Sequence, residues 1–376
     1  MVPQLPPPVL DHVLSLDVLS RRDLAQCCLV ARSFVDPARR TLYHHLTIKL
    51  EPIAGSTQCR ITRSSKARER TVAQNPRVAS LVRRIAVVED ESLGDVEEQR
   101  VTASIALARM LVHCRQVRWM DVTHCEDDFT SLLLSARLPL THLFLNEATS
   151  HEHLLPLLPS LQHLSFTLDD ETAVPADPTP VFLPSVRLSS VHPEGGAPLN
   201  VVRAFIPVFC APGNPILTRL SIPADALSFP ELDLAAFPSL TSLGLHAQDH
   251  TNSEAVKHHL PLVLSQLTAL KGLALTGSAW ARPEYLDLRT SSLAEILPVA
   301  LQVLVLGQGF SLAEVLYTLG EGAARTKLHS FKWSPPEEVL ERSLKSVEVR
   351  GLAGVCKKMG VRFQDVITYN GLMDFA

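Results

Sequence analysis

The sequence predicts an α/β fold in which a short three-helix segment precedes an irregular solenoid with parallel strands on its concave side. Three observations predict this fold. Helix start signals and apolar stripes recur across residues 5–46. The spacing L-x-x-L-x-L then occurs ten times between residues 81 and 333. Segments with helical periodicity separate many of these occurrences, so strand and helix alternate along the chain.

Each helix of the N-terminal segment has its own start signal. Three prolines, residues 6–8, precede the first helix, where a missing backbone N–H costs nothing. Ser20 and Asp23 stand at capping-box spacing before the second helix. Asp36 followed by Pro37 predicts the start of the third. Three helices in so short a segment have too much surface to bury every apolar stripe, so the excess apolar face needs a partner.

This segment resembles an F-box. The matching pieces are Leu5-Pro6, the apolar pairs Val9-Leu10 and Val13-Leu14, Asp23-Leu24, and the run Leu29-Val30-Ala31-Arg32. The run at 38–43, which leads into Leu46, is similar to fungal F-box proteins in particular. Two positions depart from the family pattern: Pro8 stands where an acidic residue is usual, and Phe34 where tryptophan is usual. The alternative is a helical cap that binds no adaptor.

The resemblance implies that the segment docks on the Skp adaptor of an SCF-type, cullin-based ubiquitin ligase. The adaptor-facing candidates are its apolar residues, although several of them must instead hold the helices together. They are Leu5, Pro6, Val9, Leu10, Val13, Leu14, Leu24, Leu29 and Val30.

The ten occurrences of L-x-x-L-x-L each end in apolar alternation of period two, which is typical of a strand. They span residues 81–87, 117–122, 140–145, 161–166, 183–188, 217–222, 240–245, 270–275, 301–306 and 328–333. Their starting points lie 21 to 36 residues apart. This pattern resembles leucine-rich repeats, in which a strand–helix unit covers its apolar face only by stacking on its neighbours.

The predicted domains are an F-box-like segment at 1–48 and an irregular leucine-rich-repeat solenoid with a C-terminal cap at 49–376. Further strands are expected at 46–50 and 361–363, and helices from Pro335 and over 352–359. The position three residues after each motif lacks a regular asparagine, so the repeats are expected to be irregular. The capping-box spacing of Ser311 and Glu314 predicts another helix start.

Composition limits the function classes. Hydrophobic residues make up 46% of the 376 residues and charged residues 20%, which indicates a folded chain. A net charge of −4 gives no overall attraction to nucleic acid or membrane. Between residues 60 and 84, eight Lys/Arg face one acid. A solvated surface is preferred there over a nucleic-acid patch, because no aromatic residues are interleaved. Seven scattered cysteines and the lack of long apolar runs or a secretory pattern predict a cytoplasmic or nuclear protein.

No catalytic motif recommends an enzyme, and no cofactor is expected. The best metal candidates are His113-Cys114 and His124-Cys125. Adjacent ligands point to opposite faces of a strand, so no metal site is expected. A hydrolase or metalloenzyme on a repeat scaffold stays the least favoured alternative.

The third and fifth positions of each motif, and the residue after it, are expected to face the concave side and to bind a protein target. The chosen candidates are Trp119, Asp121, His142, Phe144, Asn146, His163, Arg187 and Arg219. Trp119 and Phe144 either form a binding surface or tuck beneath a neighbouring loop. The predicted function is therefore a non-catalytic substrate receptor of an SCF ligase. The runner-up is an interaction scaffold with the same fold and no ligase role.

Overall fold

The computed structural model describes residues 9, 13–14, 19–30, 32–52, 59–89, 110–122, 136–145, 160–168, 179–190, 199–211, 214–248, 251–285, 293–307, 309–333 and 348–365. The chain divides into two compact units, Met1–His163 and Leu164–Ala376. The N-terminal helices, which we call the head (residues 1–48), belong to the first unit together with the first repeats.

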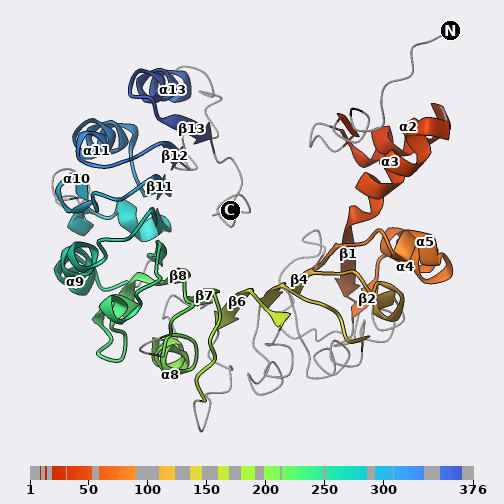
Figure 1. Ribbon diagram of the computed structural model, residues 1–376, viewed down its shortest axis with the longest axis horizontal. Coiled ribbons are helices and arrows are strands. Elements are labelled where there is room, and N and C mark those ends of the chain that lie inside the picture. Colours follow the sequence, from red (N-terminus) through yellow and green to blue (C-terminus); the bar gives the residue numbers. More distant parts are fainter. Residues whose placement is uncertain are drawn as a thin grey trace. The chain divides into compact units, whose positions relative to one another are not determined.

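Two helices form most of the described part of the head: α2 (Arg21–Val30) and α3 (Arg32–His44) (Figure 1). The predicted capping box before α2 is confirmed. The Asp23 carboxylate accepts the Ser20 backbone N–H at 2.9 Å, and the Ser20 hydroxyl accepts the Asp23 N–H at 3.2 Å.

The predicted helix start at Asp36 is wrong, because α3 begins at Arg32 and carries Pro37 in its interior. The cause is tertiary packing. Phe34, Ala38 and Leu42 recur at helical spacing and pack against the core of the head. This packing holds the helix through the proline, which removes only one intrahelical hydrogen bond.

The first unit continues with a strand ladder. Its elements are β1 (His45–Pro52), β2 (Cys59–Ile61), α4 (Arg63–Gln74), α5 (Pro76–Ala79), β3 (Arg84–Glu89), β4 (Trp119–Val122) and β5 (His142–Leu145). The strand order is β2-β1-β3-β4-β5. Strands β1 and β2 pair antiparallel, and the other pairs are parallel. Helix α3 runs into β1 without an intervening residue.

The second unit repeats the strand–helix alternation. Its strands are β6 (His163–Leu168, starting at the unit boundary), β7 (Ser185–Ser190), β8 (Arg219–Pro223), β9 (Ser242–His246), β10 (Gly272–Thr276), β11 (Val303–Leu306), β12 (Ser330–Trp333) and β13 (Arg362–Asp365). They follow one another in chain order across the sheet. The helices are α8 (Leu199–Phe209), α9 (Ser253–Gln266), α10 (Leu293–Ile296), α11 (Leu312–Arg325) and α13 (Glu348–Lys358). Short 3-10 helices are η4 (Ala224–Ser228), η5 (Leu234–Ala236), η6 (Ser278–Ala281) and η7 (Pro283–Tyr285).

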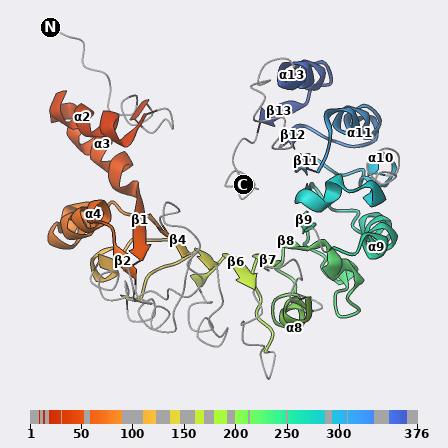
Figure 2. The same ribbon diagram turned by 180° about the vertical axis from the view of Figure 1, so that it is seen from behind.

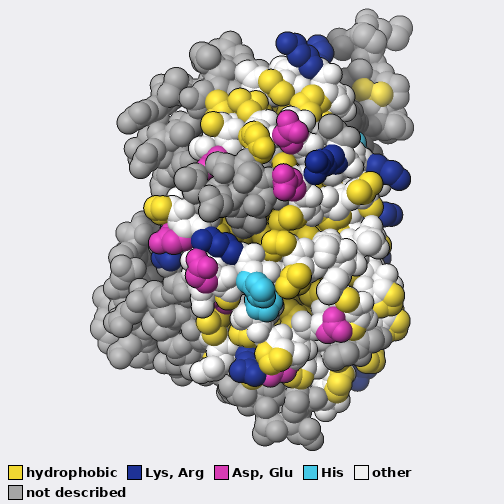
Figure 3. All heavy atoms as spheres, turned by 90° about the vertical axis from the view of Figure 1, so that its left-hand side faces the viewer, with side chains coloured by type: hydrophobic (Ala, Val, Ile, Leu, Met, Phe, Trp, Pro, Cys, Tyr) yellow, Lys and Arg dark blue, Asp and Glu magenta, His cyan; other side chains and the backbone are white. Residues whose placement is uncertain are grey.

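The core of the second unit lies between the helices and one face of the strands, and the helices all lie on that same face (Figures 1 and 2). Helix α9 directs Val256, Leu260 and Leu264 inward at i, i+4 and i+8, and all three are buried. On the sheet side, the strand leucines Leu243 and Leu273 are fully buried. On the outer surface of this unit, apolar side chains and charges of both signs are interspersed (Figure 3).

One backbone carbonyl per repeat fixes the register of its neighbour. The carbonyl of the second motif residue accepts two N–H groups, from the second and third motif residues of the next repeat. Thr218 O, for example, accepts the N–H of Thr241 at 2.9 Å and of Ser242 at 3.0 Å. Lys271 O and Gln302 O do the same two and three repeats later. The Thr241 hydroxyl adds a third bond to Thr218 O at 3.2 Å.

All ten L-x-x-L-x-L segments contain a strand, so the predicted parallel repeats are confirmed. The expected strands at 46–50 and 361–363 correspond to β1 and β13, and the helix at 352–359 to α13. The helix expected from Pro335 lies outside the described residues. Among the described residues, no helix has both the length and the apolarity that crossing a bilayer requires.

Candidate functional site

The head buries only part of its apolar surface. Its core consists of Leu14, Leu24 and Ala38, against which Phe34 and Leu42 pack. Leu14 and Leu24 were both predicted to face an adaptor. In the structure these two side chains hold the helices together, which the sequence analysis expected for several of the candidates.

Four of the predicted adaptor-facing side chains are exposed. Leu29 is 87% exposed and Val30 74%, at the C-terminal end of α2. Val9 is 43% exposed and Val13 41%. In the described part of the chain, the head therefore carries aliphatic side chains that are wholly or partly exposed. The other candidates, Leu5, Pro6 and Leu10, lie outside the described residues.

The predicted target-binding residues of the first unit lie side by side on one face of the strand ladder. The parallel register aligns Arg84 with Trp119 and Trp119 with His142. His45 aligns with Arg84 on the other side. Burial alternates along β4 and β5: Met120 and Leu143 are buried, whereas Trp119, Asp121, His142 and Phe144 are half-buried. The third and fifth motif positions therefore point away from the core, as predicted.

The rings on this face contact one another. The Arg84 guanidinium carbon lies 4.3 Å from the centroid of the Trp119 ring, a cation–π distance. Phe144 lies 5.0 Å from Trp119, and His45 meets the Trp119 ring edge-on at 5.9 Å. The stack orders Trp119 and leaves it and Phe144 half-buried rather than tucked into the core.

Two imidazoles extend the same row. His142 and His163, the last residue of the unit, stack with centroids 4.1 Å apart. The His142 Nδ1 is 2.9 Å from the Thr141 hydroxyl. Asp121 aligns with Phe144 across the next strand, and burial raises the pKa of its carboxyl. Asn146 lies outside the described residues.

The second unit places Arg187 and Arg219 on the corresponding strand positions. Both side chains are half-buried, and Arg219 aligns with Ser185 and Ser242. Hydroxyls pair across this face: Thr167 and Ser189 lie 3.1 Å apart. Strands β10 and β11 carry smaller side chains at these positions: Gly272, Ala274, Val303 and Val305.

Those smaller side chains form a flat, buried stretch. Ala274 is 3% exposed and Val305 1%. A Cβ added to Gly244 would lie 2.8 Å from the Ser221 hydroxyl, so Ser221 closes over that glycine. Strands β10 and β11 therefore present fewer half-buried polar and aromatic side chains on this face than the earlier repeats do.

The metal candidates are not brought together in the described residues. Cys114 is buried, and burial raises its pKa to about 12, which disfavours the thiolate that metals bind. Its neighbour His113 is exposed. Within the described residues no three His, Cys, Asp or Glu side chains form a group that could hold a metal ion. His124 and Cys125 lie outside those residues.

Arg84 is the site residue that the sequence analysis missed. The sequence places it in a basic stretch that is expected to be solvated because no aromatic residues are interleaved, and the first motif was taken from Leu81. The structure aligns this motif from Val82, which is fully buried. That shift of one residue makes Arg84 the third motif position, equivalent to Trp119. Threonine at the second motif position is a further sequence signal of the repeat register. The hydroxyl of Thr141, like that of Thr241, donates a hydrogen bond to a backbone carbonyl of the preceding repeat.

The sequence was compared with models of protein families and with curated proteins. No family model matches the chain, and no curated protein matches it. Its function must therefore be inferred from the head and the strand face themselves.

Proposed function

We propose that this protein is a non-catalytic substrate receptor of an SCF-type ubiquitin ligase. The F-box-like head binds a Skp-type adaptor, and the strand face of the repeats binds a protein target. The observation that carries the proposal is the exposed aliphatic end of α2, Leu29 and Val30, on a head whose sequence resembles an F-box.

The energetics of this surface favour a protein partner. Fully burying one aliphatic side chain of this size contributes about 1.5–3 kcal/mol. Leu29 and Val30 leave most of that contribution unused within the chain, and Val9 and Val13 leave about half. An adaptor that covered all four side chains would recover it. The core of Leu14, Leu24 and Ala38 keeps the two helices together while their outer faces remain available.

The target surface is the row of Trp119, Phe144 and the stacked imidazoles. Aromatic and arginine side chains that are already ordered lose little entropy on binding, which is why they dominate interaction hot spots. The receptor does no chemistry itself. It raises the local concentration of target lysines near a ubiquitin-loaded enzyme.

The adaptor assignment is tested by binding of the full chain to a purified Skp-type adaptor. The variant carries Leu29→Asp together with Val30→Asp, which places two charges in the proposed interface. The matched control is Val299→Asp, because Val299 is 68% exposed in the second unit. The expected result is adaptor binding by the wild type and the control, and its loss in the double variant at an unchanged melting temperature.

Absence of wild-type binding, or binding that survives the double substitution, overturns the adaptor assignment. The runner-up is an interaction scaffold whose head serves only as an N-terminal cap. It is favoured by the departures at Pro8 and Phe34, the second of which packs against the core of the head. If the protein is such a scaffold, the folded wild type is expected not to bind the adaptor and still to bind its target.

A further inference from the structure

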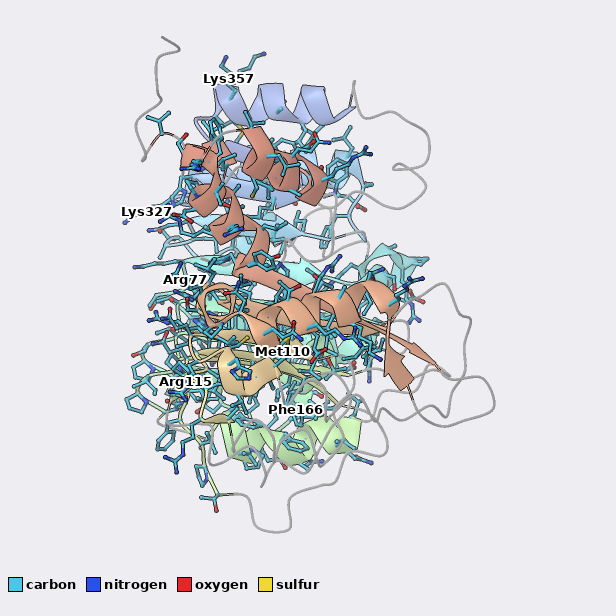
Figure 4. The ribbon with its side chains drawn as sticks, turned by 90° about the vertical axis from the view of Figure 1, so that its right-hand side faces the viewer. Arg77, Met110, Arg115, Phe166, Lys327 and Lys357 are labelled. Atoms are coloured by element: carbon cyan, nitrogen blue, oxygen red, sulfur yellow. The ribbon has the colours of Figure 1, made fainter. Side chains whose placement is uncertain are left out.

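Five arginines gather where the strands of the first unit begin. Arg83 and Arg118 directly precede β3 and β4, and the Arg118 N–H donates to the Arg83 carbonyl at 3.0 Å. Neighbouring strands lie about 4.8 Å apart, so these two arginines are adjacent. Arg77, Arg115 and Arg137 lie a few residues upstream of β3, β4 and β5. Figure 4 shows Arg77 and Arg115 on the same edge of the molecule. We call these five residues the arginine rim.

The described segments that carry the rim hold no acid that could compensate its charge. The described segments 76–83, 110–118 and 136–142 contain no Asp or Glu. Arg77, Arg115, Arg118 and Arg137 are exposed. Arg83 is half-buried and donates from Nη1 to the Ser80 carbonyl at 2.6 Å, which fixes its side chain. Within the described residues none of the five forms an ion pair.

The positive charge continues onto the strand face through Arg84. Its guanidinium lies over the Trp119 ring, so this group is positioned before any partner arrives. The positive charge also affects His44. Burial is the main cause that lowers the pKa of His44, and the charges of Arg83 and Arg84 lower it further. An anion approaching this edge would meet several guanidinium groups, of which those of Arg83 and Arg84 are held in place.

The repeat fold does not require these arginines. The segments before β8, β9 and β11, residues 214–218, 237–241 and 297–302, contain neither a basic nor an acidic residue, whereas Lys271 precedes β10 and Lys327 lies before β12. Those repeats form the same strands with the same backbone hydrogen bonds. The charge of the rim is therefore a property of this surface and not of the architecture.

We infer that the arginine rim, together with Arg84, binds an acidic segment of a partner protein. The inference rests on the proposed function and names the chemistry of the target. Guanidinium groups match carboxylates in planar, two-bond geometry, which favours arginine over lysine at such a surface. A polypeptide is preferred over nucleic acid because the described rim segments 76–83, 110–118 and 136–142 contain no Phe, Tyr or Trp on which a base could stack.

The test measures binding of a labelled peptide rich in Asp and Glu to the full chain by fluorescence anisotropy. The same peptide with Asn and Gln in place of the acids is the ligand control, and single-stranded RNA of equal charge is the competing class. The protein variant is Arg115→Gln with Arg118→Gln. Its matched control is Lys357→Gln with Lys358→Gln, two exposed lysines of α13 in the second unit.

The expected result is binding of the acidic peptide only, weakened about tenfold or more in the Arg115/Arg118 variant and unchanged in the lysine control. Affinity should also fall as salt rises above about 0.15 M. Equal binding of the uncharged peptide, no effect of the arginine variant, or tighter binding of RNA each overturns the inference. Adaptor binding, measured on the same variants, is expected to be unchanged. A failure at the rim is thereby distinguished from a failure of the adaptor assignment.

Discussion

Gly277 offers the sharpest test of how the repeats pack. It follows β10 with φ of 105° and ψ of 159°, a conformation that side-chain-bearing residues rarely adopt. A Cβ built on it would lie 2.0 Å from the Ala247 carbonyl oxygen of the preceding repeat. That oxygen accepts the Ala279 N–H at 3.3 Å, and the Ala247 N–H donates to Thr276 at 2.8 Å. The clashing atom is backbone, so no side-chain rotation relieves the overlap.

Gly277→Ala is therefore expected to destabilise the second unit. Backbone strain contributes about 1–3 kcal/mol. Losing the two hydrogen bonds around Ala247 adds about 0.5–1.5 kcal/mol each. The expected loss is about 2–6 kcal/mol, measured by urea unfolding followed by circular dichroism.

Gly320→Ala is the matched control. Gly320 is exposed within α11, and nothing lies within 4 Å of its added Cβ. Alanine there should stabilise by about 0.5–1 kcal/mol. If Gly277→Ala unfolds within about 0.5 kcal/mol of the wild type, the close approach of the two repeats at Ala247 is refuted.

Three further outcomes are expected. Tyr285→Phe should leave stability unchanged or raise it by up to about 1 kcal/mol, because the buried hydroxyl has no hydrogen-bond partner among the described residues. A clearly lower melting temperature of the variant would contradict this and would indicate that a water molecule bridges the hydroxyl to another polar group. Burial raises the pKa of Cys210 to about 12. This thiol should therefore resist alkylation in the native chain, while the half-buried Cys27 reacts. Mass spectrometry of the labelled protein shows which of the two cysteines is alkylated first. Ser311→Ala should cost about 1 kcal/mol, because the Ser311 hydroxyl and the Glu314 side chain form a capping box at the start of α11; equal melting of variant and wild type would contradict that role.

The repeat architecture could be predicted because it depends on spacing alone. Residues such as Leu243 and Leu273 recur at strand periodicity, and a period of two admits only one face for the core. The same rule correctly directed Trp119 and Phe144 away from the core. It failed at Arg84, because Leu81 and Val82 are both apolar and one residue of register separates them.

The remaining errors come from contacts between distant residues. Asp36 and Pro37 are a sound local start signal, yet the packing of Phe34 on the head core extends α3 four residues upstream of Asp36. Leu14 and Leu29 are equally apolar in sequence. Only the folded head separates them, burying the first and exposing the second.

The direct passage of α3 into β1 has a mechanical consequence. His44 ends the helix and His45 begins the strand, and the Arg83 N–H donates to the His44 carbonyl at 3.0 Å. No hinge separates the two elements, so a torque on α3 is passed to the strand that carries His45. On the proposed function, an adaptor bound to the head would therefore also set the orientation of the first strands of the unit to which the head belongs.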